Sequence, residues 1–115
     1  MARLRAALRH RRVRNEAGTF TSGDVSVDIP AHVVRRGGEE VKLTRREFEV
    51  LEILFRNAGK VVTHRQLLRE VWGQANEGDT QYLRVYVGHL RQKLEDDPAA
   101  PRLILTEPGI GYRLV

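Results

Sequence analysis

Residues 80–94 read TQYLRVYVGHLRQKL, a segment in which the large aliphatic residues recur with the period of an α-helix. Leu83, Val87, Leu90 and Leu94 are spaced i, i+4, i+7 and i+11, so they form one stripe that we expect to lie in the core. The segment contains no acidic residue. The side opposite the stripe carries Gln81, Val85, Gly88 and Gln92, flanked by Arg84, His89 and Arg91.

The residue types on this opposite side suit the recognition of bases in duplex DNA. Arginine pairs bidentately with guanine, glutamine pairs with adenine, and an exposed Val85 meets a thymine methyl group in the major groove. Gly88 would let the helix approach the groove closely. The alternative is an ordinary solvated helix face. Tyr82 and Tyr86 lie at the margin of the stripe, where we expect them to pack rather than to stack on bases.

Two further helices are predicted upstream, and each begins at a capping box. Residues 44–47 (TRRE) begin a helix that runs to about Asn57, and residues 63–66 (THRQ) begin a shorter helix that Gly73 ends. Residues 74–79 form a predicted loop before the third helix. The apolar faces are Phe48, Leu51, Leu54 and Phe55 in the first helix and Leu67, Leu68, Val71 and Trp72 in the second.

Short β-prone segments flank the helices on both sides. Four of them, residues 19–22, 25–28, 32–36 and 40–43, are separated by turn residues and predict a small antiparallel sheet. Residues 102–106 and 111–115 predict a C-terminal hairpin around the turn of residues 107–110. The fold class is therefore α+β, a helix-turn-helix with a wing.

Composition restricts the remaining classes of function. The 115 residues suffice for one domain, and the absence of cysteine excludes disulfides, thiolate metal sites and cysteine nucleophiles. The net charge of +5 says little about the body of the chain, because residues 1–14 hold six arginines and no acid. From residue 15 onward there are 14 basic and 15 acidic residues, a net charge of −1. No apolar run approaches the roughly 20 residues needed to span a bilayer. A reducing, cytoplasmic setting without a membrane is expected.

The first 18 residues are expected to be a helix fragment and a linker rather than part of the core. Leu4, Leu8 and Val13 recur at roughly helical spacing among the arginines, and residues 15–18 break the pattern. An organelle transit peptide is the less favoured alternative, because the segment has no serine. The folded domain is then expected to cover residues 19–115.

Enzymatic chemistry is not indicated. The sequence has no HExxH, no GxSxG and no phosphate-binding glycine loop, and its four histidines lack metal-ligand spacing. We therefore expect no catalytic residues, no metal and no cofactor.

Five short strings together resemble the winged-helix effector domains of OmpR/PhoB-type bacterial response regulators. Their order and spacing are more specific than any one of them. Residues 64–68, 82–86, 88–94 and 97–98 further resemble the regulators of potassium-transport (Kdp) operons. The five strings are Leu43-Thr44 with Glu47-Phe48 and Leu51, residues 59–63 (GKVVT), Leu67-Leu68 with Val71-Trp72-Gly73, Leu90-Arg91 with Lys93-Leu94, and residues 109–113 (GIGYR).

The resemblance implies a four-stranded N-terminal sheet, a three-helix bundle and a C-terminal wing, with the third helix in the major groove and the wing over the minor groove. It places base-reading residues at Val85, Gly88, His89 and Arg91, to which we add Arg84. Relatives often carry Arg where this chain has Gln81, Gly88 and Pro108, which puts the wing contact in doubt. Phosphate-contacting or positioning residues are then Thr63, His64, Trp72, Gln81, Tyr86, Thr106 and Arg113.

The same resemblance implies partners. The chain would be the effector half of a longer two-component regulator whose receiver domain, the substrate of a sensor histidine kinase, lies outside it. The regulator would bind direct-repeat operators as a dimer, while this part alone would be a monomer. Residues 74–79 (Gln74, Ala75, Asn76, Glu77, Gly78 and Asp79) would face RNA polymerase, commonly its sigma subunit, unless they form a simple connector. The rival interpretation is a winged helix that binds RNA polymerase or another protein without reading DNA.

Overall fold

The computed structural model describes residues 13–14, 18–73 and 79–115. They belong to two compact units, Met1–Lys42 and Leu43–Val115, which we describe separately. The first unit is an antiparallel sheet in the order β1-β2-β3-β4-β5. Its strands are β1 (Val13–Arg14), β2 (Thr19–Ser22), β3 (Val25–Asp28), β4 (Val33–Arg36) and β5 (Glu39–Val41).

The four predicted strands correspond to β2–β5, and the two-residue β1 pairs with β2 at the edge of the sheet. The helical interpretation of the first segment therefore does not extend to Val13, and residues 1–12 lie outside the described part. Phe20, Val27 and Val34 are direct cross-strand neighbours, and all three are buried. Between β4 and β5, Gly37 and Gly38 both have positive φ, as the two central residues of a type I′ hairpin turn require.

The second unit holds the helices α2 (Arg45–Arg56), α3 (His64–Trp72) and α4 (Thr80–Leu94). The predicted boundaries of all three helices are confirmed within about one residue. The capping box of Thr44 and Glu47 is present in full, whereas at α3 only the Thr63 hydroxyl caps, accepting from the amide of Gln66. The stripe of Leu83, Val87, Leu90 and Leu94 is buried, as are the other predicted core residues except Trp72, which is half-buried.

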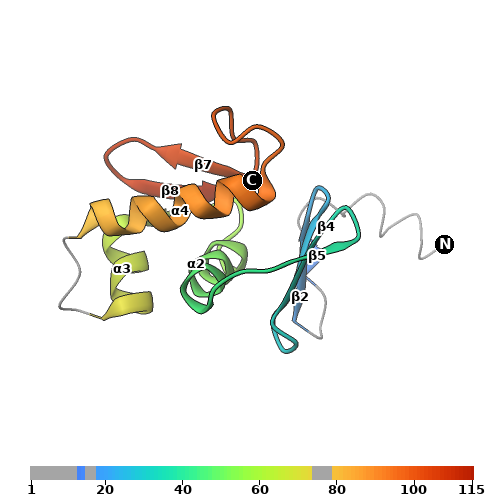
Figure 1. Cartoon of the computed structure of the whole chain (residues 1–115). Coiled ribbons are helices and arrows are strands. Elements are labelled where there is room, and N and C mark those ends of the chain that lie inside the picture. Colours follow the sequence, from blue (N-terminus) through green and yellow to red (C-terminus); the bar gives the residue numbers. More distant parts are fainter. Residues whose placement is uncertain (1–12, 15–17, 74–78) are drawn as a thin grey trace. The chain divides into compact units, whose positions relative to one another are not determined.

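Three strands complete this unit, in the sheet order β6-β8-β7. The predicted hairpin is formed by β7 (Ile104–Glu107) and β8 (Gly111–Leu114), and β6 (Val61–Thr63) adds a strand that the sequence pattern does not reveal, because three residues are too few for a period. Figure 1 shows α4 (orange) passing α3 and running beside the hairpin, which we call the wing. The turn of residues 107–110 closes with a bond from the Ile110 amide to the Glu107 carbonyl (2.9 Å), and Gly109 at φ 75° follows Pro108 as in a type II turn.

Candidate nucleic-acid interface

Helix α4 presents an exposed side opposite its buried stripe. Gln81, Arg84, Val85 and Gln92 are exposed, and 46% of the surface of Val85 is open to solvent although the residue is aliphatic. Gly88 is half-buried, yet a Cβ added there would meet no atom within 4 Å. This side of α4 is thus open at Gly88, which suits close approach by a large ligand.

One flank of α4 is aromatic and packs against the end of α3. The ring centroid of Trp72 lies 5.2 Å from that of Tyr82 and 5.0 Å from that of Tyr86, and these two tyrosines are 5.6 Å apart. Burial, followed by the hydrogen bond with Tyr82, raises the pKa of Tyr86 above its usual 10.0. The predicted packing role of both tyrosines agrees with this geometry. The cluster fixes the N-terminal half of α4 against α3.

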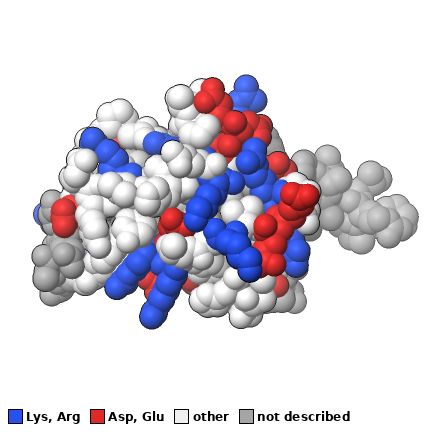
Figure 2. Space-filling view, viewed as in Figure 1, with Lys and Arg blue, Asp and Glu red and all other residues white. Residues whose placement is uncertain are grey.

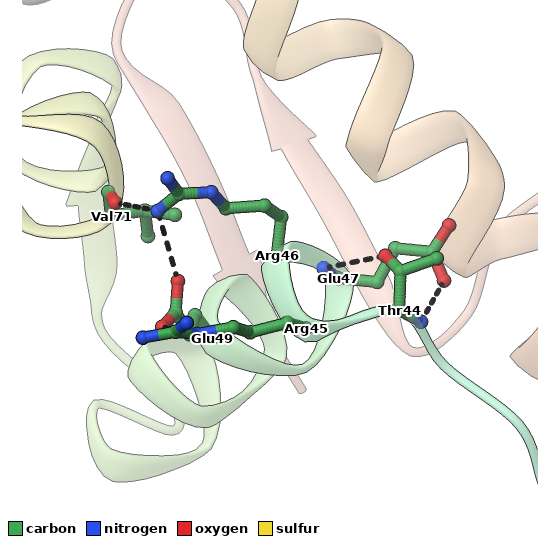
Figure 3. A network of polar contacts seen from close by, with 6 residues as sticks. All are labelled: Thr44, Arg45, Arg46, Glu47, Glu49 and Val71. Atoms are coloured by element: carbon green, nitrogen blue, oxygen red, sulfur yellow. Dashed lines mark hydrogen bonds and ion pairs between the residues drawn. The ribbon is translucent and has the colours of Figure 1, made fainter.

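Arg46 extends the aromatic cluster from the start of α2, a contact that the sequence analysis did not predict. Its guanidinium donates to the carbonyl of Val71 and to Glu49 Oε1 (3.3 Å), and its Cζ lies 5.7 Å from the Trp72 ring centroid. Figure 3 shows Arg46 reaching from α2 to the last turn of α3 beside Glu49. Arginine at this place satisfies a carbonyl at the helix end and carries positive charge next to Trp72.

Glu47 is a buried carboxylate that joins α2 to α4. Its side chain is 4% exposed, and it accepts from Lys93 Nζ (2.7 Å) and the Thr44 amide (3.0 Å). Its Oε2 lies 3.2 Å from Nδ1 of His89, so one predicted base-reading residue is oriented by this acid. The sequence could have indicated the burial of Glu47, because it precedes Leu51 and Leu54 by four and seven residues and so lies on the core stripe of α2.

Folding lowers the pKa of Glu47 below its ordinary value of 4.5. Burial acts to raise this pKa, but the hydrogen bonds from Lys93 and Thr44 and the charges of Lys93 and His89 outweigh it. A lowered pKa means that the ionised carboxylate stabilises the fold above the pKa of the unfolded chain. That stability is lost as the pH falls below about 4.5.

We therefore expect the free energy of unfolding to fall more steeply between pH 5 and pH 3 in the wild type than in Glu47→Gln. The amide cannot titrate, so its variant is less stable at pH 7 but approaches the wild type in acid. Denaturant titrations at several pH values measure this difference. Glu52→Gln, on an exposed ion pair with Arg56, is the control and should keep the wild-type drop. Parallel curves for the wild type and Glu47→Gln would contradict the assignment.

The other flank of α4 carries two arginines with different surroundings. Arg84 is exposed and, among the described residues, has no salt-bridge partner. Arg91, two turns later, donates to the carbonyl of Ile104 through Nε (3.2 Å) and Nη2 (2.9 Å) and to Thr106 Oγ1 (2.7 Å). Because these partners are uncharged, the positive charge of Arg91 remains uncompensated by them.

The wing is fastened to the end of α4 by Glu95, which the sequence analysis did not single out. Glu95 is only 5% exposed. Its two carboxylate oxygens accept from the amides of Arg102 (2.8 Å), Leu103 (3.1 and 3.0 Å) and Ile104 (2.8 Å). One side chain therefore satisfies three backbone donors at the start of β7.

The predicted phosphate-positioning residues lie on α3, on α4 and in the wing, with Thr63 directly before α3. Thr63 and His64 are at the start of α3, where the His64 amide donates to the Ile110 carbonyl at 3.0 Å. Arg113 is paired with Glu107 across the wing at 3.0 Å, which offsets its charge. The hydroxyl of Thr106 is occupied by Arg91, whereas Gln81 is exposed on α4. Trp72 and Tyr86 belong to the aromatic cluster described above.

The predicted polymerase-facing loop is described only at its end. Residues 74–78 lie outside the described part, and Asp79 is an exposed N-cap of α4 whose side chain makes no capping hydrogen bond. In Figure 2 acidic side chains (red) gather over the loop that follows α4, while the surface over the first half of α4 is mainly uncharged, with a few basic groups (blue). No three His, Asp or Glu side chains of the described ranges form a metal-binding group, and no helix there is long and apolar enough to cross a membrane.

Comparison with known proteins identifies the family to which this architecture belongs. The family model described as "Transcriptional regulatory protein, C terminal" matches residues 38–114. The KDP operon transcriptional regulatory protein KdpE of Escherichia coli (strain K12) is 53% identical over 115 residues, which cover 99% of this chain and 51% of KdpE. The chain thus spans about half the length of this relative.

Two solved structures are similar as well. The response regulator DrrB of Thermotoga maritima, an OmpR/PhoB homologue, has a TM-score of 0.78 and 32% identity and covers 99% of this chain and 50% of its own. The RstA DNA-binding domain of Klebsiella pneumoniae, solved in complex with the RstA box, has a TM-score of 0.77 and 30% identity over 84% of this chain and 96% of its own. This chain therefore belongs to the family of transcriptional regulatory protein C-terminal domains, the winged-helix domains of OmpR/PhoB-type response regulators.

Proposed function

We propose that this domain regulates transcription by binding a specific sequence of double-stranded DNA, with α4 in the major groove. The observation that carries the proposal is the build of α4 itself. Four aliphatic residues anchor it in the core, while its opposite side is exposed, free of acid and open at Gly88. A helix of this kind beside a wing is the element that helix-turn-helix proteins insert into the groove.

The bases would be read by the exposed side of α4. Arg84 has a free fork of donors for guanine O6 and N7, and Val85 offers an apolar contact to a thymine methyl group. Gly88 leaves room for the helix to sit close to the base edges, and His89 contributes a ring that Glu47 orients. Arg91 would have to release the carbonyl of Ile104 and the hydroxyl of Thr106 before it could meet a base.

The sugar-phosphate backbone would be contacted by residues on either side of this surface. Trp72, Tyr86 and Gln81 border the first half of α4, and Thr63 and His64 begin α3. Such contacts fix register without reading sequence. Arg113 and Thr106 would bring the wing to the minor groove. The positive charge that Arg113 carries there is offset by its ion pair with Glu107. The RstA domain, solved with its RstA box, supports DNA as the ligand of this fold.

The proposal extends beyond this domain, because the chain spans about half the length of KdpE and of DrrB. By similarity to KdpE and DrrB, residues 1–18 would link it to a receiver domain that a sensor histidine kinase phosphorylates in the cytoplasm. Phosphorylation would pair two effector domains on a direct-repeat operator, and residues 74–79 would contact the sigma subunit of RNA polymerase. This domain alone would be a monomer without enzymatic activity.

Selection of bound duplexes from a random pool tests the proposed function. We expect enrichment of one sequence that the domain binds at least about 1,000 times more tightly than random DNA. Recovery of no sequence preference, with capture of RNA polymerase by the same domain, would instead favour the protein-binding alternative.

Adding charge at Gln81 should strengthen binding to any duplex. Gln81 is exposed on α4 near the predicted phosphate contacts, so Gln81→Arg adds about one phosphate contact, which steepens the slope of log K against log salt by about 0.9. Ala99→Arg carries the same charge on the exposed loop after α4 and should leave the slope nearly unchanged. Equal slopes for Gln81→Arg and the wild type would show that residue 81 lies away from the sugar-phosphate backbone of the DNA.

A further inference from the structure

Arg91 occupies the junction between α4 and the wing. Its guanidinium makes three hydrogen bonds to β7, two to the carbonyl of Ile104 and one to the hydroxyl of Thr106. Its Cζ also lies 5.7 Å from the ring centroid of Tyr112 on β8. One side chain of α4 therefore touches both strands of the wing.

These contacts are ones that a base-reading arginine would have to give up. The Ile104 residue is completely buried, so its carbonyl would lose charged donors that water cannot easily replace. Arg84 differs in this respect. It lies on the same side of α4, is exposed, and has no salt-bridge partner among the described residues.

We propose that Arg91 is a positioning residue that fixes the wing beside α4, so that helix and wing meet the two grooves in register. This assignment rests on the proposed function, since it concerns how the domain meets duplex DNA. The two wing attachments are complementary. Glu95 holds the beginning of β7 through its backbone amides, and Arg91 holds the strand further along through Ile104 and Thr106.

The test is a double-mutant cycle on the DNA sequence enriched from the random pool. Arg91→Ala should bind about tenfold more weakly, the effect of losing one or two charge-assisted hydrogen bonds, with unchanged preference at every base pair. Thr106→Val should weaken binding less. The double variant should lie within about twofold of Arg91→Ala, because both changes break the same attachment.

Losses that simply add, or an Arg91→Ala variant that loses preference at a single base pair, would overturn the positioning role and leave the proposed function intact. Thermal melting checks that each variant is folded. If Arg91→Ala does not fold, Arg91→Lys takes its place in the cycle. Lysine keeps the charge and one donor for the Ile104 carbonyl, so this variant should retain part of the wild-type affinity. A wild-type domain without any sequence preference would overturn the proposed function, and the positioning role with it.

Discussion

Gly111→Ala is expected to lower the free energy of unfolding by about 3 kcal/mol, the upper end of the usual cost of overpacking. A Cβ at this position would lie 1.9 Å from the carbonyl oxygen of Val62 and 2.8 Å from Cα of Thr63. Both are backbone atoms of β6, so no side chain can move aside. The strand must separate from β8, which breaks the pairing that joins the wing to the start of α3.

Gly88→Ala is the matched control for this substitution. The added methyl group is the same, but at Gly88 it meets no atom within 4 Å, and alanine favours a helix by roughly 0.5–1 kcal/mol over glycine. The two variants should therefore shift in opposite directions in denaturant titrations followed through Trp72, the single tryptophan. A Gly111→Ala domain as stable as the wild type would show that β6 and β8 are not in such close contact.

Glu95→Ala is expected to cost about 3 kcal/mol or more in the same titration. Its carboxylate is the acceptor for three amides, those of Arg102, Leu103 and Ile104, and an unsatisfied buried donor costs about 1–3 kcal/mol. Alanine leaves all three without this partner. The wing should loosen as well, so DNA affinity should fall together with stability.

Two further variants separate the role of this acceptor from the loss of a glutamate in general. Glu95→Gln keeps one acceptor oxygen and should lose about half as much stability as Glu95→Ala. Glu52→Ala breaks an exposed i,i+4 pair with Arg56 and should cost only about 0.3–0.5 kcal/mol. Equal losses for Glu95→Ala and Glu52→Ala would contradict the role assigned to Glu95.

Local sequence patterns were sufficient to predict the three helices and the C-terminal hairpin of the second unit. The period of residues 80–94 identified the buried stripe of α4, and the Thr44 capping box located the start of α2. These features depend on residues three or four apart, whose relation a helix determines. β6 was not predicted, because its three residues are recognisable as a strand only through their pairing with β8, some 50 residues later in the chain.

The polar contacts of the site could be predicted only in part, because they join distant elements. On a helical wheel Arg84 lies about 90° and Arg91 about 70° from the centre of the stripe, on the same side, so the helical period does not distinguish their roles. They differ because Arg91 is level with β7 and Arg84 is not. In the same way Glu47 was recognised as a cap, but its contact with Lys93, 46 residues away, requires the packing of α2 on α4.

The most direct test of α4 as the reading helix compares Arg84→Ala with Arg56→Ala on the enriched duplex. Both variants lose one exposed arginine, but Arg56 lies at the end of α2, paired with Glu52. An electrophoretic shift titration should show that Arg84→Ala binds about 10–100 times more weakly and no longer discriminates at one base pair, the loss expected for a base-contacting arginine. Arg56→Ala should bind within about twofold of the wild type. Equal, small effects of the two substitutions would contradict the placement of α4 in the major groove.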